Sequence, residues 1–317
     1  MSDRSNNILD CMDCSKTQER RAENQVTTIF HNSNILPDYA SKTKLEVMNE
    51  NRENGAKTSH DVHNGTPVSW NTYHTYKSPC IALGVYVRQE YNVKDLHDIT
   101  PKMVDSFLKF EADCEIKYST FDKNCSAIEK FCDCINEQNG YKQDFHSVIS
   151  DNRVSAKDTL PASDYTTRAY DSPTAIIGEL SGNAQIAAEL QYSCGLRISD
   201  ACYIKSNQFD GQNLTVHSKN GQYLTVQVNS ALADKITAEI KENGSFSISK
   251  DSYSYQLQKA CAAVGEEFHG SHGLRHNFAQ EKMVEYTGGG MSYNKALQAV
   301  SEDMGHHRPD ITKVYLR

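Results

Sequence analysis

The chain has 317 residues, which is enough for two domains and an additional arm. Hydrophobic residues make up 38% of it and tyrosine occurs 17 times, so the composition excludes a wholly disordered protein. With 33 Lys and Arg against 41 Asp and Glu, the net charge of −8 excludes a uniformly basic nucleic-acid-binding chain. Taken alone, this charge argues against a nucleic-acid partner, although a count over the whole chain leaves room for local basic patches.

Targeting and redox features point to one compartment. No run approaches the roughly 20 apolar residues of a membrane helix, and residues 1–10 lack the basic start and apolar run of a signal peptide. The ten cysteines are spread over the chain, which favours reduced thiols over a disulfide framework. We expect a cytoplasmic protein without a membrane partner.

The first two regions differ in hydrophobic pattern. Residues 1–66 are polar and weakly periodic, which predicts an N-terminal arm of uncertain order. Residues 67–155 carry apolar and aromatic side chains at helical spacing, and Thr100-Pro101 is a typical helix start. This pattern predicts a small helical domain. The polar segment 156–170 is expected to be a linker.

The third region, residues 171–317, mixes helices and strands. Two β-rich runs, Asn213–His217 and Tyr223–Val228, flank Asn220-Gly221, which is a strong hairpin signal. Helical patterns follow at Ala231–Glu242, Tyr253–Val264, Leu274–Tyr286, Tyr293–Met304 and Asp310–Leu316.

Five short elements in this region carry chemically versatile residues. They are Gly195–Asp200 (GLRISD), Lys219 in the hairpin turn, His272–His276 (HGLRH), Gly305-His306 and Tyr315. Each one alone usually has an ordinary explanation, such as helix capping, solvation in a turn or packing. Their order and spacing make the combination specific.

Together these elements resemble the tyrosine recombinases, the family of lambda-type integrases and Xer-type enzymes. The family pattern is G-L-R-x-S-E/D, a hairpin Lys, H-x-L-R-H, L-G-H and a Tyr nine residues later. Here Tyr315 follows His306 by nine residues, Thr312 matches the family's Thr, and Met304 replaces the usual Leu. The motifs cover residues 171–317, while residues 67–155 match only loosely, as the family's core-binding domain.

The resemblance implies a mainly α fold with a small β-hairpin or sheet. Two domains would form a clamp on DNA: a helical core-binding domain and a mixed α+β catalytic domain. The implied function is site-specific DNA recombination of the integrase or transposase type through a 3′-phosphotyrosine, serving a mobile element. The alternatives are a type IB topoisomerase or hairpin telomere resolvase with the same chemistry, and a non-catalytic DNA-binding regulator.

The resemblance and the chemistry suggest a role for each motif residue. Arg197 and Arg275 suit a phosphate, because a guanidinium is permanently charged and forks onto two oxygens. Tyr315 is the expected nucleophile. Lys219 is the expected general acid for the leaving 5′ oxygen, and His272 the acid–base aid to the tyrosine.

Three further residues complete the expected catalytic set. By resemblance, His306 donates a hydrogen bond to a non-bridging phosphate oxygen. Asp200 and His276 are expected to support the other side chains.

A metal-dependent reaction is not expected. His272 and His276 lie one helical turn apart, but the HExxH pattern is absent and Arg275 between them would repel a cation. The Cys11-x-x-Cys14 pair lacks a second pair close by. We therefore expect neither a metal nor a cofactor.

The expected partner is a double-stranded recombination site. A homotetramer would assemble on two DNA duplexes from a monomer or weak dimer. Two sets of basic residues are candidates for DNA contacts: Lys77, Arg88, Lys109, Lys117, Lys123 and Lys130 in the helical domain, and Lys205, Lys259, Lys282 and Arg308 in the catalytic domain.

Overall fold

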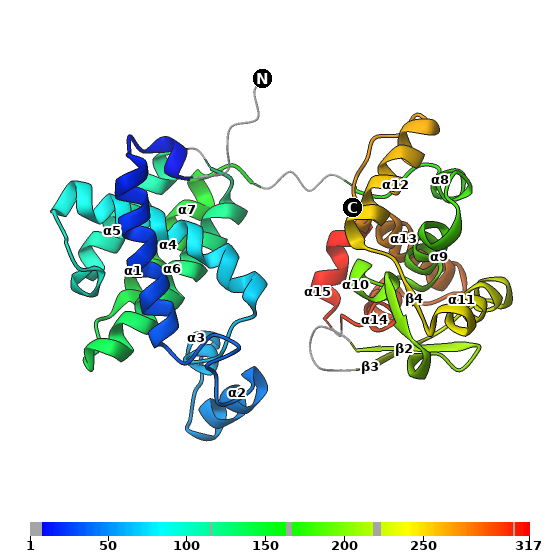
Figure 1. The fold of residues 1–317 in the computed structure, drawn as a ribbon, viewed down its shortest axis with the longest axis horizontal. Helices are drawn as coiled ribbons and strands as arrows, with labels where there is room; N and C mark the ends of the chain where they lie inside the picture. The colour runs from blue at the N-terminus through cyan, green and yellow to red at the C-terminus, as the bar shows by residue number, and fades with distance from the viewer. Residues whose placement is uncertain (1–7, 115, 163–166, 218–222, 307) are drawn as a thin grey trace. The chain divides into compact units, whose positions relative to one another are not determined.

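The computed structural model describes residues 8–114, 116–162, 167–217, 223–306 and 308–317. The chain divides into two compact units, Met1–Asp164 and Tyr165–Arg317, which are described separately here (Figure 1). No helix in the described part of the chain is long and apolar enough to cross a membrane.

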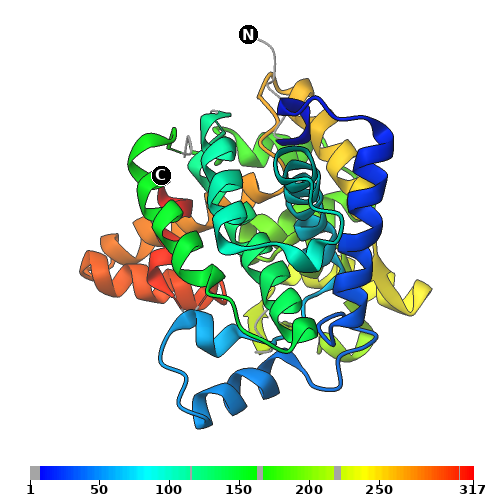
Figure 2. The same ribbon diagram turned by 90° about the vertical axis from the view of Figure 1, so that its left-hand side faces the viewer.

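The regular elements in the described part of unit 1 are all helices. Its elements are η1 (Ile8–Cys11), α1 (Lys16–Asn32), α2 (Lys44–Glu53), α3 (Ser59–His63), α4 (Trp70–Tyr91), η2 (Leu96–Asp98), α5 (Pro101–Asp113), α6 (Tyr118–Asn139) and α7 (Phe145–Thr159). Helix α4 packs against α1, α5 and α6, and α7 packs against α5 and α6 (Figure 2).

Helix α1 is part of the core of unit 1, which corrects the expected arm at residues 1–66. Its buried residues Ala22, Val26, Ile29 and Phe30 recur at helical spacing and form one apolar stripe. The rings of Phe30 and Phe131 lie 5.4 Å apart. The sequence of α1 is polar on its remaining faces, so its average composition hides this stripe.

Unit 2 begins its regular structure after the polar segment. Its elements are α8 (Pro173–Gly178), α9 (Gly182–Cys194), α10 (Ile198–Ala201), β1 (Tyr203–Lys205), η3 (Ser206–Gln208), β2 (Asn213–His217), β3 (Tyr223–Gln227), α11 (Ser230–Asn243), β4 (Ser245–Ser247), α12 (Lys250–Ala263), α13 (His272–Gly288), α14 (Tyr293–Asp303), α15 (Pro309–Thr312) and η4 (Lys313–Leu316).

Two small antiparallel sheets accompany these helices. Strand β1 pairs with β4, and β2 pairs with β3, with His217 opposite Tyr223 at the turn end. The predicted hairpin is therefore present, and the fold is mainly helical with small sheets, as expected. Its turn, including Lys219, lies outside the described residues.

Buried polar contacts in unit 2 fix the chain after α9. The Tyr253 hydroxyl donates to Oε1 of Gln191 at 2.7 Å, and Nε2 of Gln191 donates to the Leu196 carbonyl at 3.3 Å. Tyr253, Gln191 and Leu196 are all fully buried. These bonds hold in place the loop that carries Arg197.

Candidate active site

The first motif lies where α9 turns into α10. Gly195 ends α9 with φ +61°, a conformation that favours glycine, and a side chain there would collide with the Phe278 ring. Arg197 follows as the N-cap of α10. The contact between Gly195 and the Phe278 ring therefore places the loop that carries Arg197 against α13.

The second motif opens α13. Gly273 lies so close to the Arg168 carbonyl and the Tyr170 ring that a Cβ there would be 2.7 Å from the carbonyl oxygen. Tyr170 and Asn277 exchange two hydrogen bonds: the Tyr170 amide donates to Oδ1 at 3.0 Å, and Nδ2 donates to the Tyr170 carbonyl at 2.7 Å. The segment before α8 is therefore tied to the helix that carries His272, His276 and Arg275.

Arg275 has the largest side chain among the fully buried residues that the structure describes. Its guanidinium donates to the Gly195 carbonyl, to the Met304 carbonyl at 2.7 Å and to Nε2 of His306 at 3.0 Å. Burial lowers its pKa to about 10, so it stays charged at neutral pH. Its buried Nε has no hydrogen bond among the described residues, which leaves a donor for a ligand oxygen.

His306 is fixed at both ring nitrogens. Arg275 can only donate, so Nε2 of His306 accepts, and its ring proton lies on Nδ1, 3.1 Å from the Thr312 hydroxyl. A hydroxyl both donates and accepts. Thr312 can therefore support either tautomer of His306, including the one in which Nε2 donates to a phosphate oxygen.

Tyr315 lies in η4, with its ring among the motif residues. Its ring centroid is 4.5 Å from that of His276, 5.1 Å from that of His306 and 6.5 Å from that of His272. The Arg275 guanidinium carbon lies 5.7 Å from the same centroid. A half-buried tyrosine is thus placed within reach of a buried cation and three imidazoles.

The electrostatic environment keeps the histidines neutral. Burial and the nearby Arg275 lower the pKa of His272. Burial, Arg168 and His272 lower the pKa of His276 to about 4. A neutral His272 is in the protonation state that a base requires at neutral pH.

The carboxyl group of Asp200 belongs to the same environment. Burial raises the pKa of Asp200, although Arg197 and Arg275 oppose this shift.

The structure brings together most of the predicted catalytic set. His272, Arg275, His276 and His306 surround Tyr315, and Arg197 and Asp200 belong to the same electrostatic cluster. The described residues do not include Lys219. The supporting contacts of Gln191, Tyr170 and Asn277 had no signal in the sequence, because their partners are distant along the chain or belong to the backbone.

The basic residues proposed for DNA binding have unequal access to solvent. Lys130 is buried and donates to the His63 carbonyl at 3.3 Å, so it is removed from the set of candidates. Arg88 is half-buried and donates to Gln25 and to the Lys94 carbonyl. Both are therefore structural in this unit.

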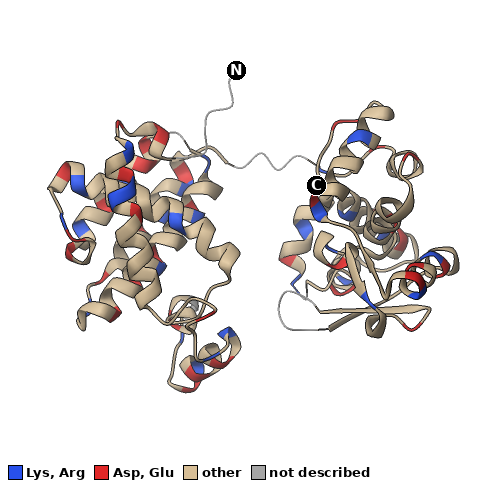
Figure 3. Cartoon of the chain, viewed as in Figure 1, with Lys and Arg blue, Asp and Glu red and all other residues tan. Residues whose placement is uncertain are grey.

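The remaining candidates keep at least part of their side chains in solvent. Ion pairs with carboxylates engage Lys77, Lys109, Lys282 and Arg308. Exposed positions are held by Lys117, Lys123, Lys205 and Lys259. Lys and Arg are interspersed with Asp and Glu over the described parts of both units (Figure 3).

Comparison with known proteins agrees with this geometry. Residues 174–317 match the model of the phage integrase family. This segment is therefore a domain of the phage integrase family, the tyrosine recombinases. The chain is a site-specific recombinase, an enzyme that cleaves and rejoins DNA strands, and the topoisomerase, resolvase and regulator alternatives are not favoured. No curated protein sequence matches the chain.

Solved structures share the fold at low sequence identity. The XerH site-specific recombinase bound to its difH substrate is 15% identical, with a TM-score of 0.58 over 96% of this chain and 94% of that one. A lambda integrase (75–356) dimer bound to a core site is 17% identical, with a TM-score of 0.54 over 79% of this chain and 89% of that one. Both matches extend beyond unit 2, so the helical fold of unit 1 is shared as well.

Proposed function

We propose that Tyr315 is the nucleophile of this recombinase. Its hydroxyl oxygen attacks the scissile phosphorus, the bond from phosphorus to the 5′ oxygen breaks, and a 3′-phosphotyrosine and a free 5′ hydroxyl result. The position of the Tyr315 ring, beside the Arg275 guanidinium and three imidazoles, is the observation that carries the proposal. Attack by the 5′ hydroxyl of another strand reverses the step and releases the tyrosine.

The two arginines neutralise the phosphate. Arg275 is held by two backbone carbonyls, so its orientation is set before DNA binds. Its Nε has no hydrogen bond among the described residues and is left as a donor for a phosphate oxygen. Arg197 lies at the N-cap of α10, where its charge acts on Asp200 and Arg275. Preorganised donors of this kind stabilise the negative charge that develops in the transition state.

Proton transfers fall to two other side chains. Neutral His272 accepts the proton of the Tyr315 hydroxyl, and Lys219 protonates the leaving 5′ oxygen. When a phosphate oxygen takes the place of the Arg275 contact at Nε2, His306 donates to this non-bridging oxygen in the tautomer that carries its proton on Nε2, with Nδ1 accepting from the Thr312 hydroxyl. Asp200 and His276 support this set: Asp200 interacts electrostatically with Arg197 and Arg275, and the His276 ring lies beside that of Tyr315.

The proposed substrate is a double-stranded recombination site. Two similar structures support it: XerH is bound to difH, and a lambda integrase tetramer with a TM-score of 0.52 is bound to a Holliday junction. By analogy, a homotetramer would exchange strands between two duplexes in the cytoplasm. Service to a mobile element is the corresponding biological role.

A nicked suicide substrate tests this function. The protein is incubated with duplexes that lose a short 5′ fragment after cleavage, and covalent adducts are separated on a denaturing gel. Wild-type protein should form an adduct linked to the 3′ phosphate, and Tyr315→Phe should form none while still binding DNA. Tyr293→Phe, at an exposed position of α14, is the matched control and should behave as wild type. An adduct with Tyr315→Phe would overturn the assignment.

A further inference from the structure

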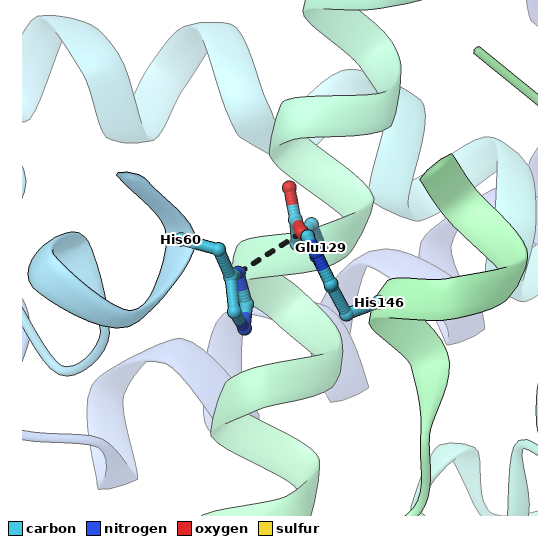
Figure 4. Close-up of side chains that lie close together, drawn as sticks. All are labelled: His60, Glu129 and His146. Atoms are coloured by element: carbon cyan, nitrogen blue, oxygen red, sulfur yellow. Dashed lines mark hydrogen bonds and ion pairs between the residues drawn. The ribbon is translucent and has the colours of Figure 1, made fainter. Parts of the chain in front are cut away.

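A cluster of two histidines and a glutamate lies in unit 1, far from the recombinase motifs in the sequence. His60 belongs to α3, Glu129 to α6 and His146 to α7 (Figure 4). Nδ1 of His60 lies 3.0 Å from Oε1 of Glu129, and Nδ1 of His146 bonds the same oxygen. The two imidazole rings are stacked with centroids 4.0 Å apart. One candidate ligand atom from each of the three residues thus lies close to the other two.

We propose that His60, Glu129 and His146 form a Zn²⁺ site that fastens α3 to the helical bundle. Two imidazole nitrogens and one carboxylate oxygen are a donor set that zinc accepts, with a water in the fourth position. The three atoms lie within 4.8 Å of one another, so small side-chain shifts bring each to the roughly 2.1 Å of a zinc bond.

The surroundings of Glu129 suit a metal ligand. Arg153 donates to Oε2 at 3.1 Å and leaves Oε1 to the histidines, so it orients the carboxylate as outer-shell partners of metal ligands do. The Arg153 charge is also shared with Asp122, in an ion pair of 3.1 Å. Asp133 lies one helical turn from Glu129 and interacts electrostatically with His60, although burial raises the pKa of its carboxyl.

A bound ion would have a structural effect on the segment that carries α2 and α3. Helix α2 buries none of its residues, and it packs mainly against α3. In the described part of unit 1, the His60 contacts and the bond from Lys130 to the His63 carbonyl connect α3 to the bundle. Ligation of one ion by residues of three helices would add a further connection between this segment and the bundle.

Metal binding by the protein with both units present tests the site. Stripped of metal, wild-type protein should bind one equivalent of Co²⁺ with the visible absorption of a tetrahedral N/O site, and Zn²⁺ should displace it. His60→Ala and His146→Ala should each lose this site. Both side chains are partly exposed, so the substitutions should leave the helical circular dichroism unchanged. His74→Ala, at an exposed position of α4, is the control that should retain binding.

Limited proteolysis tests the structural effect. Zn²⁺ should slow trypsin cleavage after Lys57, between α2 and α3, at least fivefold in wild-type protein and leave the rate unchanged in His146→Ala. Two results would overturn the proposal: Co²⁺ binding that survives in both histidine variants, which places the metal elsewhere, or a wild-type protein that binds none. In the second case the three side chains form a metal-free hydrogen-bonded cluster.

Discussion

Replacing Arg275 with Lys separates the charge of this residue from its geometry. The native guanidinium bonds the Gly195 and Met304 carbonyls and the His306 ring from one rigid fork. An ammonium keeps the charge but is a point donor on a flexible stem, so it cannot reproduce these bonds together with one to phosphate. Loss of one preorganised donor to a transition state costs on the order of 3 kcal/mol, or about a hundredfold in rate.

The same substitution should also weaken the fold. A buried carbonyl without a partner costs about 1–3 kcal/mol, and Arg275→Lys leaves at least one of the two carbonyls in that condition. Urea unfolding should therefore show a loss of stability of this size. Adduct formation should be measured under conditions in which the variant is folded, together with equilibrium DNA affinity.

A matched control shows whether the effect of Arg275→Lys is specific to the active site or follows from any arginine-to-lysine change. Arg52→Lys changes an exposed arginine of α2 whose guanidinium bonds only Asn49 among the described residues, and it should alter neither stability nor cleavage. We expect Arg275→Lys to cleave at least about a hundredfold more slowly with nearly unchanged DNA affinity. A folded variant that cleaves at the wild-type rate would refute a role for Arg275 at the phosphate.

Three other predictions test separate parts of the site. Lys219→Ala should cut an ordinary substrate very slowly but a 5′-bridging phosphorothiolate at nearly the wild-type rate, because a thiolate leaving group needs no acid; equal damage on both substrates would leave the acid unassigned. Thr312→Val removes the hydroxyl at Nδ1 of His306 and should slow cleavage about fivefold to tenfold without changing DNA affinity, and an unchanged rate would show that the ring needs no such support. Because the folded protein lowers the pKa of His276 to about 4, only the unfolded chain binds a proton at this histidine between about pH 6.5 and pH 4. The contribution of this group to the free energy of unfolding should therefore be fully present above pH 6.5 and fall by about 3 kcal/mol toward pH 4. In urea unfolding at a series of pH values, His276→Gln should reduce this loss.

The catalytic motifs were visible in the sequence because the chemistry fixes their residue types and their order. Tyr315 and His306 are held at a set spacing by a short helical turn, and Gly195 is required by a positive φ and by the Phe278 ring. Local backbone geometry of this kind leaves a sequence signal. The hairpin was predicted for the same reason, from Asn-Gly between two β-rich runs.

Contacts between distant segments left no such signal. Helix α1 was expected to be part of an arm because most of its surface is polar, yet Phe30 packs on Phe131, about a hundred residues later in the sequence. Lys130 was counted as a DNA contact because a lysine is usually exposed, but the His63 carbonyl binds it inside unit 1. The cluster around Glu129 likewise requires the tertiary fold.

Mapping the DNA-linked residue tests the central claim most directly. The covalent adduct is digested with nuclease and trypsin, and the peptide that carries the remaining nucleotide is sequenced by mass spectrometry. Trypsin cleaves after Lys313, so we expect the modified peptide to be Val314–Arg317, with the nucleotide on Tyr315. A nucleotide on any other peptide, or no covalent peptide from protein that cleaves DNA, would contradict the account.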